Sequence, residues 1–243
     1  MKLKPLFYAL TAMAAVACSS PQEEQPSAKS KNYTDIQVVG AMKNVMWKGQ
    51  LQGSIDLDSL SDKKGVYGLG PLSYLRGELL INNGTCYVSK VTSDSTMSVE
   101  ETFAVSAPFF VYGQVNEWQE MKLPADVKSI HDLEVLINEK TKDFKRPFAF
   151  KLIGKAASAI IHIQNLAEGS VVSSPAEAHQ GQINYTLEKE EVEIVGFFST
   201  EHQGVFTHHD SFLHMHLITK DKSKMGHLDE IEFEEMTLLL PSL

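Results

Sequence analysis

The chain has 243 residues, of which 43% are hydrophobic, and its formal net charge is −9. This length and apolar content allow a sizeable core, in one large domain or in two small ones. The negative charge and the lack of a basic stripe with interleaved aromatic residues exclude nucleic acid as an expected partner.

The first 18 residues have the features of an export signal. Lys2 and Lys4 precede an apolar run, residues 6–16, that is too short to span a membrane comfortably. The run ends in Ala15-Val-Ala-Cys18, which resembles a bacterial lipoprotein signal in which Cys18 becomes the lipidated first residue. We therefore expect an exported protein that a lipid at Cys18 anchors to a membrane. A conventional cleaved signal peptide, with a secreted soluble protein, is the alternative.

A tether is predicted to separate this signal from the folded region. Residues 19–31 are rich in Ser, Pro, Gln, Glu and Lys, a composition typical of flexible segments. The folded region is therefore expected over residues 32–243. Cys86 is the only cysteine besides Cys18. If Cys18 carries lipid, Cys86 has no disulfide partner, and we expect it to be buried in a strand.

The N-terminal half of the folded region, about residues 32–145, is predicted to contain helices and strands. Apolar residues at helical spacing predict a helix from a cap at Thr34 to Gly49. The Asn-Gly turn between two apolar runs predicts a hairpin over residues 79–88. The other predicted features are tight turns at the glycines of residues 65–70, strands at residues 102–105 and 109–112, and a helix in residues 124–140 capped by Ser129.

The C-terminal half, about residues 146–243, is predicted to be mostly β. The expected segments are a hairpin of residues 148–154 and 159–163, a strand at 192–198, a loop at 199–211 and a last strand at 232–240. His162, Glu191 and Glu193 alternate with apolar residues and are expected on exposed strand faces. The element order predicts a β-rich α+β fold with mixed sheets and few helices, and it allows two similar β-α-β halves.

Three histidines near the end of the chain form the strongest candidate site. His214 and His216 lie two residues apart in an apolar, strand-forming run, so their side chains should share one face. The polar segment after this run ends in glycine and predicts a hairpin loop that returns His227 to the pair. Three converging imidazoles are the ligand set of a catalytic zinc site, which keeps a further position open. The alternative is a polar surface pair, and the nearby His208 and His209 are interpreted as loop residues.

Several sequence blocks follow one another in a specific order. Ile194-Val-Gly-Phe-Phe198, Phe212-Leu-His-Met-His-Leu-Ile218 and Met225-Gly-His-Leu228 resemble I-V-G-F-W, G-Y-H-L-H-F-I and G-G-H-V-L. Tyr67-Gly-Leu-Gly70 and Gly77-Glu-Leu79 resemble F-G-L-G and D-G-E-M, and the segment from Phe148 to Gly154 more weakly resembles F-Y-A-I-R-I-D-G. These are the blocks of the alpha-acetolactate decarboxylase family, which roughly residues 32–240 resemble.

The resemblance implies a site and a reaction. It implies zinc held by His214, His216 and His227, with Glu78 beside the metal to take, deliver or orient a proton. It places Lys151 where the family has an arginine, so Lys151 is expected to hold the departing carboxylate or the developing oxyanion. The implied substrate is a small 2-hydroxy-3-oxo acid, 2-acetolactate, which loses CO2 to give acetoin. The resemblance also implies a homodimer.

Two departures from the family leave alternatives open. Lysine at position 151 lacks the bidentate fork of arginine, and the chain stops at Pro241-Ser-Leu243 without the acidic tail that the family adds. A diverged member that binds metal or a small hydroxy-keto acid with little turnover is therefore the second hypothesis. A cupin-type metal oxygenase ranks lower, because Lys220 and Asp221 stand where that class has a glutamate.

Overall fold

Strands outnumber helices in the structure, a computed structural model that describes Met1 and residues 35–242. The expected signal peptide and the tether of residues 19–31 lie outside the described residues, apart from Met1. The β-rich α+β prediction is confirmed, since the described helices are few and short. They are α1 (Met42–Lys48), α2 (Ile130–Lys140) and α3 (Pro175–Ala178), besides single turns at Leu57–Ser59 and Ser73–Leu75. None of these helices combines the length and apolarity that a membrane crossing requires.

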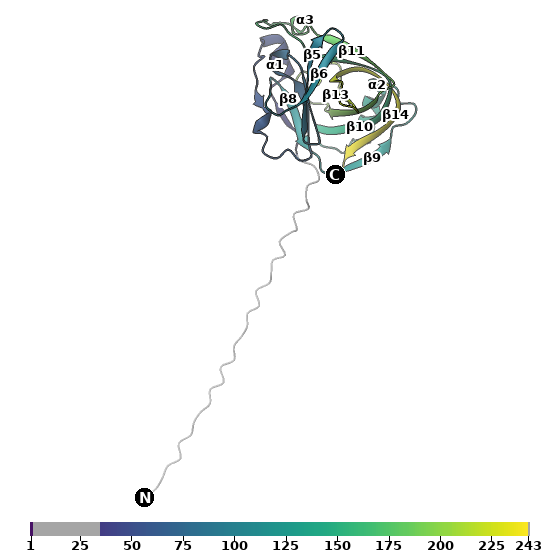
Figure 1. Cartoon of the computed structure of the whole chain (residues 1–243). Coiled ribbons are helices and arrows are strands. Elements are labelled where there is room, and N and C mark those ends of the chain that lie inside the picture. Colours follow the sequence, from purple (N-terminus) through teal and green to yellow (C-terminus); the bar gives the residue numbers. More distant parts are fainter. Residues whose placement is uncertain (2–34, 243) are drawn as a thin grey trace. The chain divides into compact units, whose positions relative to one another are not determined.

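Two six-stranded sheets organise the described residues (Figure 1). The first has the strand order β1 (Gln37–Val39), β8 (Phe110–Gln114), β3 (Val66–Pro71), β4 (Glu78–Asn82), β5 (Thr85–Ser93) and β6 (Thr96–Glu101). The second has the order β11 (Ile183–Glu188), β10 (Phe148–Ile163), β12 (Glu191–Phe198), β13 (Leu213–Thr219), β14 (Met225–Pro241) and β9 (Trp118–Lys122). A small pair joins β2 (Ile55–Asp56) to β7 (Ser106–Ala107). The described pairings in both large sheets are antiparallel, which refines the prediction of mixed sheets.

The second sheet closes on itself, because β10 pairs with both β12 and β14. β12, β13 and β14 complete the ring. Apolar residues on the inner face of this ring form one core with Leu133 and Ile137 of α2. A second core lies between the two sheets, where Leu69 and Val111 of the first meet Val195 and Ile218 of the second. β9 and α2, which precede residue 145, belong with the second sheet.

Local sequence signals predicted the start of α2 correctly and α1 only in part. The Ser129 cap of α2 is confirmed as a capping box: Asp132 N donates to Ser129 Oγ at 3.3 Å, and Ser129 N donates to Asp132 Oδ2 at 3.0 Å. The helix predicted from Thr34 is wrong in its first half, where β1 pairs with β8. Gly40, with φ +68°, separates β1 from α1, and α1 ends at Gly49 as predicted.

The hairpin predicted at residues 79–88 is confirmed. Asn83 and Gly84 both have positive φ, as a tight two-residue turn requires. Cys86 is buried as expected, and burial raises the pKa of its thiol to about 12. The strand predicted at residues 102–105 is wrong, because the ladder ends with β6.

Three other strand predictions are corrected. Residues 65–70 do not form tight turns throughout, since most belong to buried β3. Gly68 is needed there for packing, because a Cβ on it would lie 2.7 Å from Cε1 of Phe110. The hairpin predicted at residues 148–163 is the single strand β10, and the last strand begins at Met225 rather than at residue 232. Pairing with β14 continues on both sides of Gly154, with register shifts between Lys155 and Ile161, so β10 is one strand rather than a hairpin.

Replacement of Gly154 with alanine should destabilise the fold strongly. Gly154 has φ +152°, and an added Cβ would overlap the backbone carbonyl oxygen of Glu235 on β14. We expect a loss of about 3 kcal/mol or more in the free energy of unfolding, measured by urea denaturation. Gly169→Ala is the matched control, because Gly169 also has positive φ but no atom within 4 Å of the added Cβ, and should lose only about 1 kcal/mol. Equal losses of stability in the two variants would contradict the explanation that the Glu235 carbonyl excludes a side chain at position 154.

Candidate metal centre

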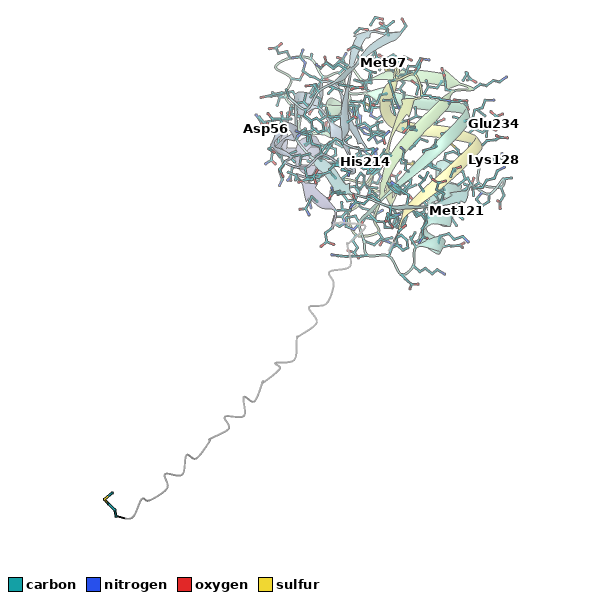
Figure 2. The ribbon with its side chains drawn as sticks, turned by 60° about the horizontal axis from the view of Figure 1, so that its bottom comes forward. Asp56, Met97, Met121, Lys128, His214 and Glu234 are labelled. Atoms are coloured by element: carbon teal, nitrogen blue, oxygen red, sulfur yellow. The ribbon has the colours of Figure 1, made fainter. Side chains whose placement is uncertain are left out.

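Strand register brings the three predicted ligands together. His216 of β13 lies opposite His227 of β14, and His214 shares the face of His216 two residues earlier. The ring centroids are 5.3 Å apart for His214 and His216, 4.9 Å for His214 and His227, and 5.5 Å for His216 and His227. One nitrogen from each ring lies within 4.8 Å of the others. Figure 2 labels His214 toward the middle of the view, with Asp56 and Glu234 at the rim.

The triad, defined here as His214, His216 and His227, has the chemistry of a metal site. All three side chains are buried. Nδ1 of His214 and both ring nitrogens of His216 have no hydrogen-bond partner among the described residues. Burial lowers the pKa of His216 to about 3, and it lowers the pKa of His214 and His227 well below the ordinary value. Neutral imidazoles with unpaired nitrogens are the form that binds a divalent metal, so these residues fit one.

Glu78 lies beside the triad, at the start of β4 in the facing sheet. Its Oε1 accepts from the Gln164 backbone N–H at 3.2 Å, and its Oε2 lies 3.7 Å from Nε2 of His216. Burial raises the pKa of Glu78 well above its usual range. The hydrogen bond from Gln164 opposes this rise, and the negative charge of Asp229 adds to it. This shift favours the protonated form of Glu78 when no cation is present.

His162 was predicted on an exposed strand face, and that prediction is wrong. The side chain is only 5% exposed, because β14 covers this end of β10 and sets His162 opposite His227. The two ring centroids are 4.6 Å apart. Nδ1 of His162 lies 2.8 Å from each carboxylate oxygen of Asp229, which fixes the ring. The alternation of polar and apolar residues along β10 was read correctly, but the polar face is covered by other elements.

Further polar residues that the sequence did not single out complete the site. His208 lies on the loop between β12 and β13, as predicted, but its Nε2 is 3.3 Å from Nε2 of His227. Gln164 places Nε2 3.1 Å from Nδ1 of His179 and 3.4 Å from Nε2 of His162. The sequence signal that could have revealed these residues is the number of histidines. The chain has nine, and six of them lie around this site.

The space beside these groups is small. It measures about 30 Å³, and Met42, Met46 and Phe109 line its apolar side. The polar side consists of Glu78, His162, Gln164, His179, His208, His214 and His227. Helix α1 and the first sheet therefore cover the metal-binding face of the second sheet, and water has little access.

Lys151 lies close to the triad, but its charge is paired elsewhere. It is opposite Val195 of β12, which is itself opposite His216 of β13, so roughly 10 Å separates the backbones of Lys151 and His216. Its Nζ forms a buried ion pair with Oε2 of Glu193 at 2.7 Å and does not line the cavity beside the histidines. Glu193, predicted on an exposed face, is partly buried by this pair and by bonds from Lys222 and Asn82.

Lys151→Met should therefore weaken folding without weakening metal binding. Burial opposes the charge on Glu193, yet hydrogen bonds from Lys151, Lys222 and Asn82 outweigh it and lower the pKa of Glu193 to about 2. The resulting stability is present above the unfolded pKa of about 4.3 and is lost as pH falls toward 2. We expect urea unfolding at pH 7 to show a loss of about 1–3 kcal/mol that shrinks near pH 3.

The control for Lys151 is Lys155→Met, which breaks the exposed pair with Glu234. That variant should change stability by well under about 1 kcal/mol. A loss of metal from Lys151→Met, with folding stability unchanged, would instead show that Lys151 acts at the metal site.

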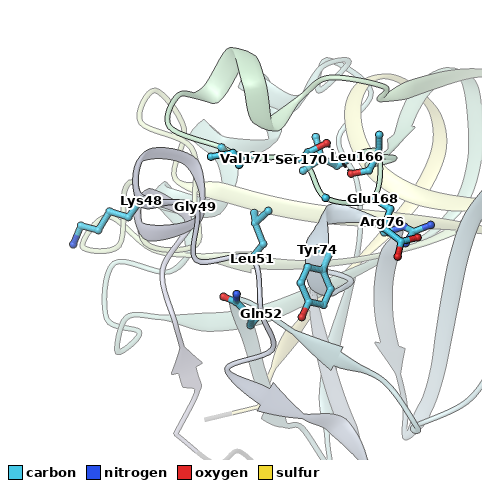
Figure 3. Close-up of a pocket in the computed structure, with 13 residues that line it drawn as sticks. Lys48, Gly49, Leu51, Gln52, Tyr74, Arg76, Leu166, Glu168, Ser170 and Val171 are labelled. Carbon is cyan, nitrogen blue, oxygen red and sulfur yellow. Dashed lines mark hydrogen bonds and ion pairs between the residues drawn. The ribbon is translucent and has the colours of Figure 1, made fainter.

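A larger cavity lies elsewhere on the described part of the chain (Figure 3). It measures about 660 Å³ and is lined by the end of α1, the turn at Ser73–Leu75 and residues 166–172. Its charged pair, Arg76 and Glu168, is exposed, with 3.4 Å between Nη1 and Oε2. No histidine lines it, so the metal chemistry belongs to the smaller cavity.

Comparison with known proteins identifies the family. A sequence model of alpha-acetolactate decarboxylase matches residues 38–242. The chain is 24% identical over 248 aligned positions to an alpha-acetolactate decarboxylase of Brevibacillus brevis, covering 94% of this chain and 80% of the relative. Its fold matches a crystal structure of alpha-acetolactate decarboxylase from Bacillus subtilis (TM-score 0.70, 22% identity, 86% of each chain). It also matches a Staphylococcus aureus protein of unknown function similar to alpha-acetolactate decarboxylase (TM-score 0.72, 17% identity, 86% and 85% of the chains). The chain therefore belongs to the alpha-acetolactate decarboxylase family.

Proposed function

We propose that this protein is a zinc-dependent carboxy-lyase that converts 2-acetolactate to acetoin and CO2. The observation that carries the proposal is the buried triad of neutral histidines, with unpaired nitrogens, in a chain of this family. In the reaction, the bond between C2 and the carboxylate breaks and CO2 leaves. The electron pair of that bond passes into the adjacent ketone to give an enediolate, and one proton added to carbon gives acetoin.

A zinc ion on the triad would supply positive charge to the ketone and hydroxyl oxygens as the enediolate forms. The triad suits zinc because neutral imidazoles leave the ion its full double charge. Its three nitrogens also leave room in the coordination sphere for oxygen ligands.

Glu78 and His162 are the groups proposed to act on the substrate. Glu78 lies in the buried cavity beside His216 with a raised pKa, so it can deliver a proton to the enediolate and regain from water the one proton that each turnover consumes. His162 lines the cavity and its Nδ1 donates to Asp229, so its Nε2 can accept a hydrogen bond from the substrate hydroxyl.

Acetoin release is the test of this function. Protein lacking residues 1–18 should convert racemic 2-acetolactate to acetoin faster than the spontaneous reaction. Removal of zinc with a chelator should abolish the excess rate, and added zinc should restore it. Bound zinc with no excess acetoin would instead favour the second hypothesis, a diverged member that binds metal without efficient turnover.

We also propose that the protein is exported and anchored through lipid at Cys18, and that it forms a homodimer. The support for export is the signal-like sequence of residues 1–18, and the support for the dimer is the family resemblance. Mass spectrometry of the mature N-terminus should find a diacylated Cys18, and Cys18→Ala should release the protein from membranes. Light scattering of the soluble form should give twice the chain mass.

A further inference from the structure

A fourth histidine approaches the triad. Nε2 of His208 lies 3.3 Å from Nε2 of His227, and its ring centroid is 6.5 Å from that of His214. In a tetrahedral zinc site with bonds of 2.0–2.1 Å, neighbouring ligand nitrogens are about 3.4 Å apart. The spacing of His208 and His227 is that of two ligands of one ion, although His208 lies outside the group of triad nitrogens that are all within 4.8 Å of one another.

Hydrogen bonds anchor the loop that carries His208 both before and after that residue. Backbone N–H groups of Met42 and Lys43 donate to the carbonyls of Val205 and Gly204 at 2.7 and 3.0 Å. On the other side, Glu134 accepts from the hydroxyl of Ser211 at 2.7 Å. These anchors on α1 and α2 leave a short segment between them, and within it the His208 ring turns inward while His209 is exposed.

The other polar groups near the triad have different partners. His162 donates to Asp229 through Nδ1, and His179 meets Gln164 and Gln182. The Nε2 atom of His208 instead faces a nitrogen of the triad.

We propose that His208 is a fourth nitrogen ligand that closes the metal site when no substrate is bound. This rests on the proposed function for the metal at the triad. His208 also lines all three cavities around the site, of about 30, 230 and 190 Å³. The innermost has room for about one or two waters, far less than 2-acetolactate needs. Substrate therefore binds when its oxygens replace His208 and the ring moves out, which joins the inner cavity to its neighbours.

Metal affinity of two variants tests this ligand. Zinc dissociation constants would be measured on the metal-free protein by competition with a chromogenic chelator. We expect His208→Ala and His208→Gln to bind zinc roughly 100-fold more weakly than the wild type, the share of one ligand among four. The glutamine variant preserves side-chain bulk in case alanine disturbs the loop. His209→Ala, which removes the adjacent exposed histidine, should match the wild type.

Cobalt spectra give a second readout, independent of turnover. The Co²⁺-loaded wild type should show the intense visible bands of a four-nitrogen tetrahedral ion. His208→Ala should show weaker bands, because water raises the coordination number. Titration with 2-hydroxyisobutyrate, a chelating hydroxy acid, should perturb the cobalt bands at lower concentration in His208→Ala, where no histidine has to be displaced.

The outcomes separate this inference from the function it rests on. Unchanged zinc affinity and cobalt spectrum in both His208 variants would overturn the fourth ligand and reduce the contact with His227 to a hydrogen bond. If wild-type protein of normal melting temperature binds neither metal, both the triad proposal and the His208 proposal fail. Zinc bound through the triad, with the His208 variants alone weakened, supports both.

Discussion

Replacing both His214 and His216 with alanine should remove the bound metal and acetoin formation together. Each of these buried rings presents a nitrogen without a partner among the described residues, so each is positioned to give one metal bond. A zinc site contributes about 10–16 kcal/mol, so the loss of each ligand should weaken binding by about 100-fold or more. Elemental analysis should find about one zinc per wild-type chain and less than about 0.1 in the variant.

Without metal, the wild type and the His214→Ala, His216→Ala variant should differ little in folding stability. In the wild type without metal, unpaired buried nitrogens cost about 1–3 kcal/mol each, which offsets the cavity that alanine leaves. Added zinc should raise the melting temperature of the wild type alone, since binding to the folded state stabilises it. His131→Ala combined with His209→Ala removes two exposed histidines and is the matched control. Zinc retained by the triad variant would disprove the site.

Glu78→Gln should lower the turnover number by about 100- to 10,000-fold while zinc stays bound. The amide oxygen can still accept from the Gln164 backbone, so the local structure should survive. It cannot exchange a proton as the carboxyl group does, and proton transfer by a positioned side chain contributes a factor of this size. The measurements are the turnover number for acetoin release and the zinc content of the same preparation. Glu188→Gln, on an exposed residue of β11, should leave both unchanged.

The pH dependence of stability provides a second check on Glu78. Its pKa is raised in the folded, metal-free protein, so the unfolded chain releases this proton first as pH rises above about 4.3. Stability should therefore fall with rising pH until the folded pKa is passed. In the metal-free state, the stability of Glu78→Gln relative to the wild type should increase as pH rises from the unfolded to the folded pKa of Glu78. A parallel loss of zinc from the variant would identify Glu78 as a ligand instead of a proton carrier.

The placement of Lys151 shows how far a short sequence block can be trusted. The block from Phe148 to Gly154 does lie in a strand of the zinc-binding sheet, as the resemblance implied. The direction of each side chain differs, however: Lys151, two strands from His216, pairs with Glu193, while His162 of the same strand lies against His227. The sequence prediction divided this region into a hairpin after Gly154, so it did not show that Lys151 and His162 lie on one strand.

Local sequence alone determined the triad, because His214 and His216 are two residues apart in one strand and a short loop returns His227. It also determined the Ser129 cap and the turn at Asn83 and Gly84, where neighbouring residues carry the signal. The family resemblance placed Glu78 beside the metal, but only the tertiary structure decided that His162 and His208 would join the triad. Glu78 arrives from the facing sheet, His162 from β10 and His208 from the loop before β13. Their meeting depends on pairing and packing between distant segments, for which no short-range pattern exists.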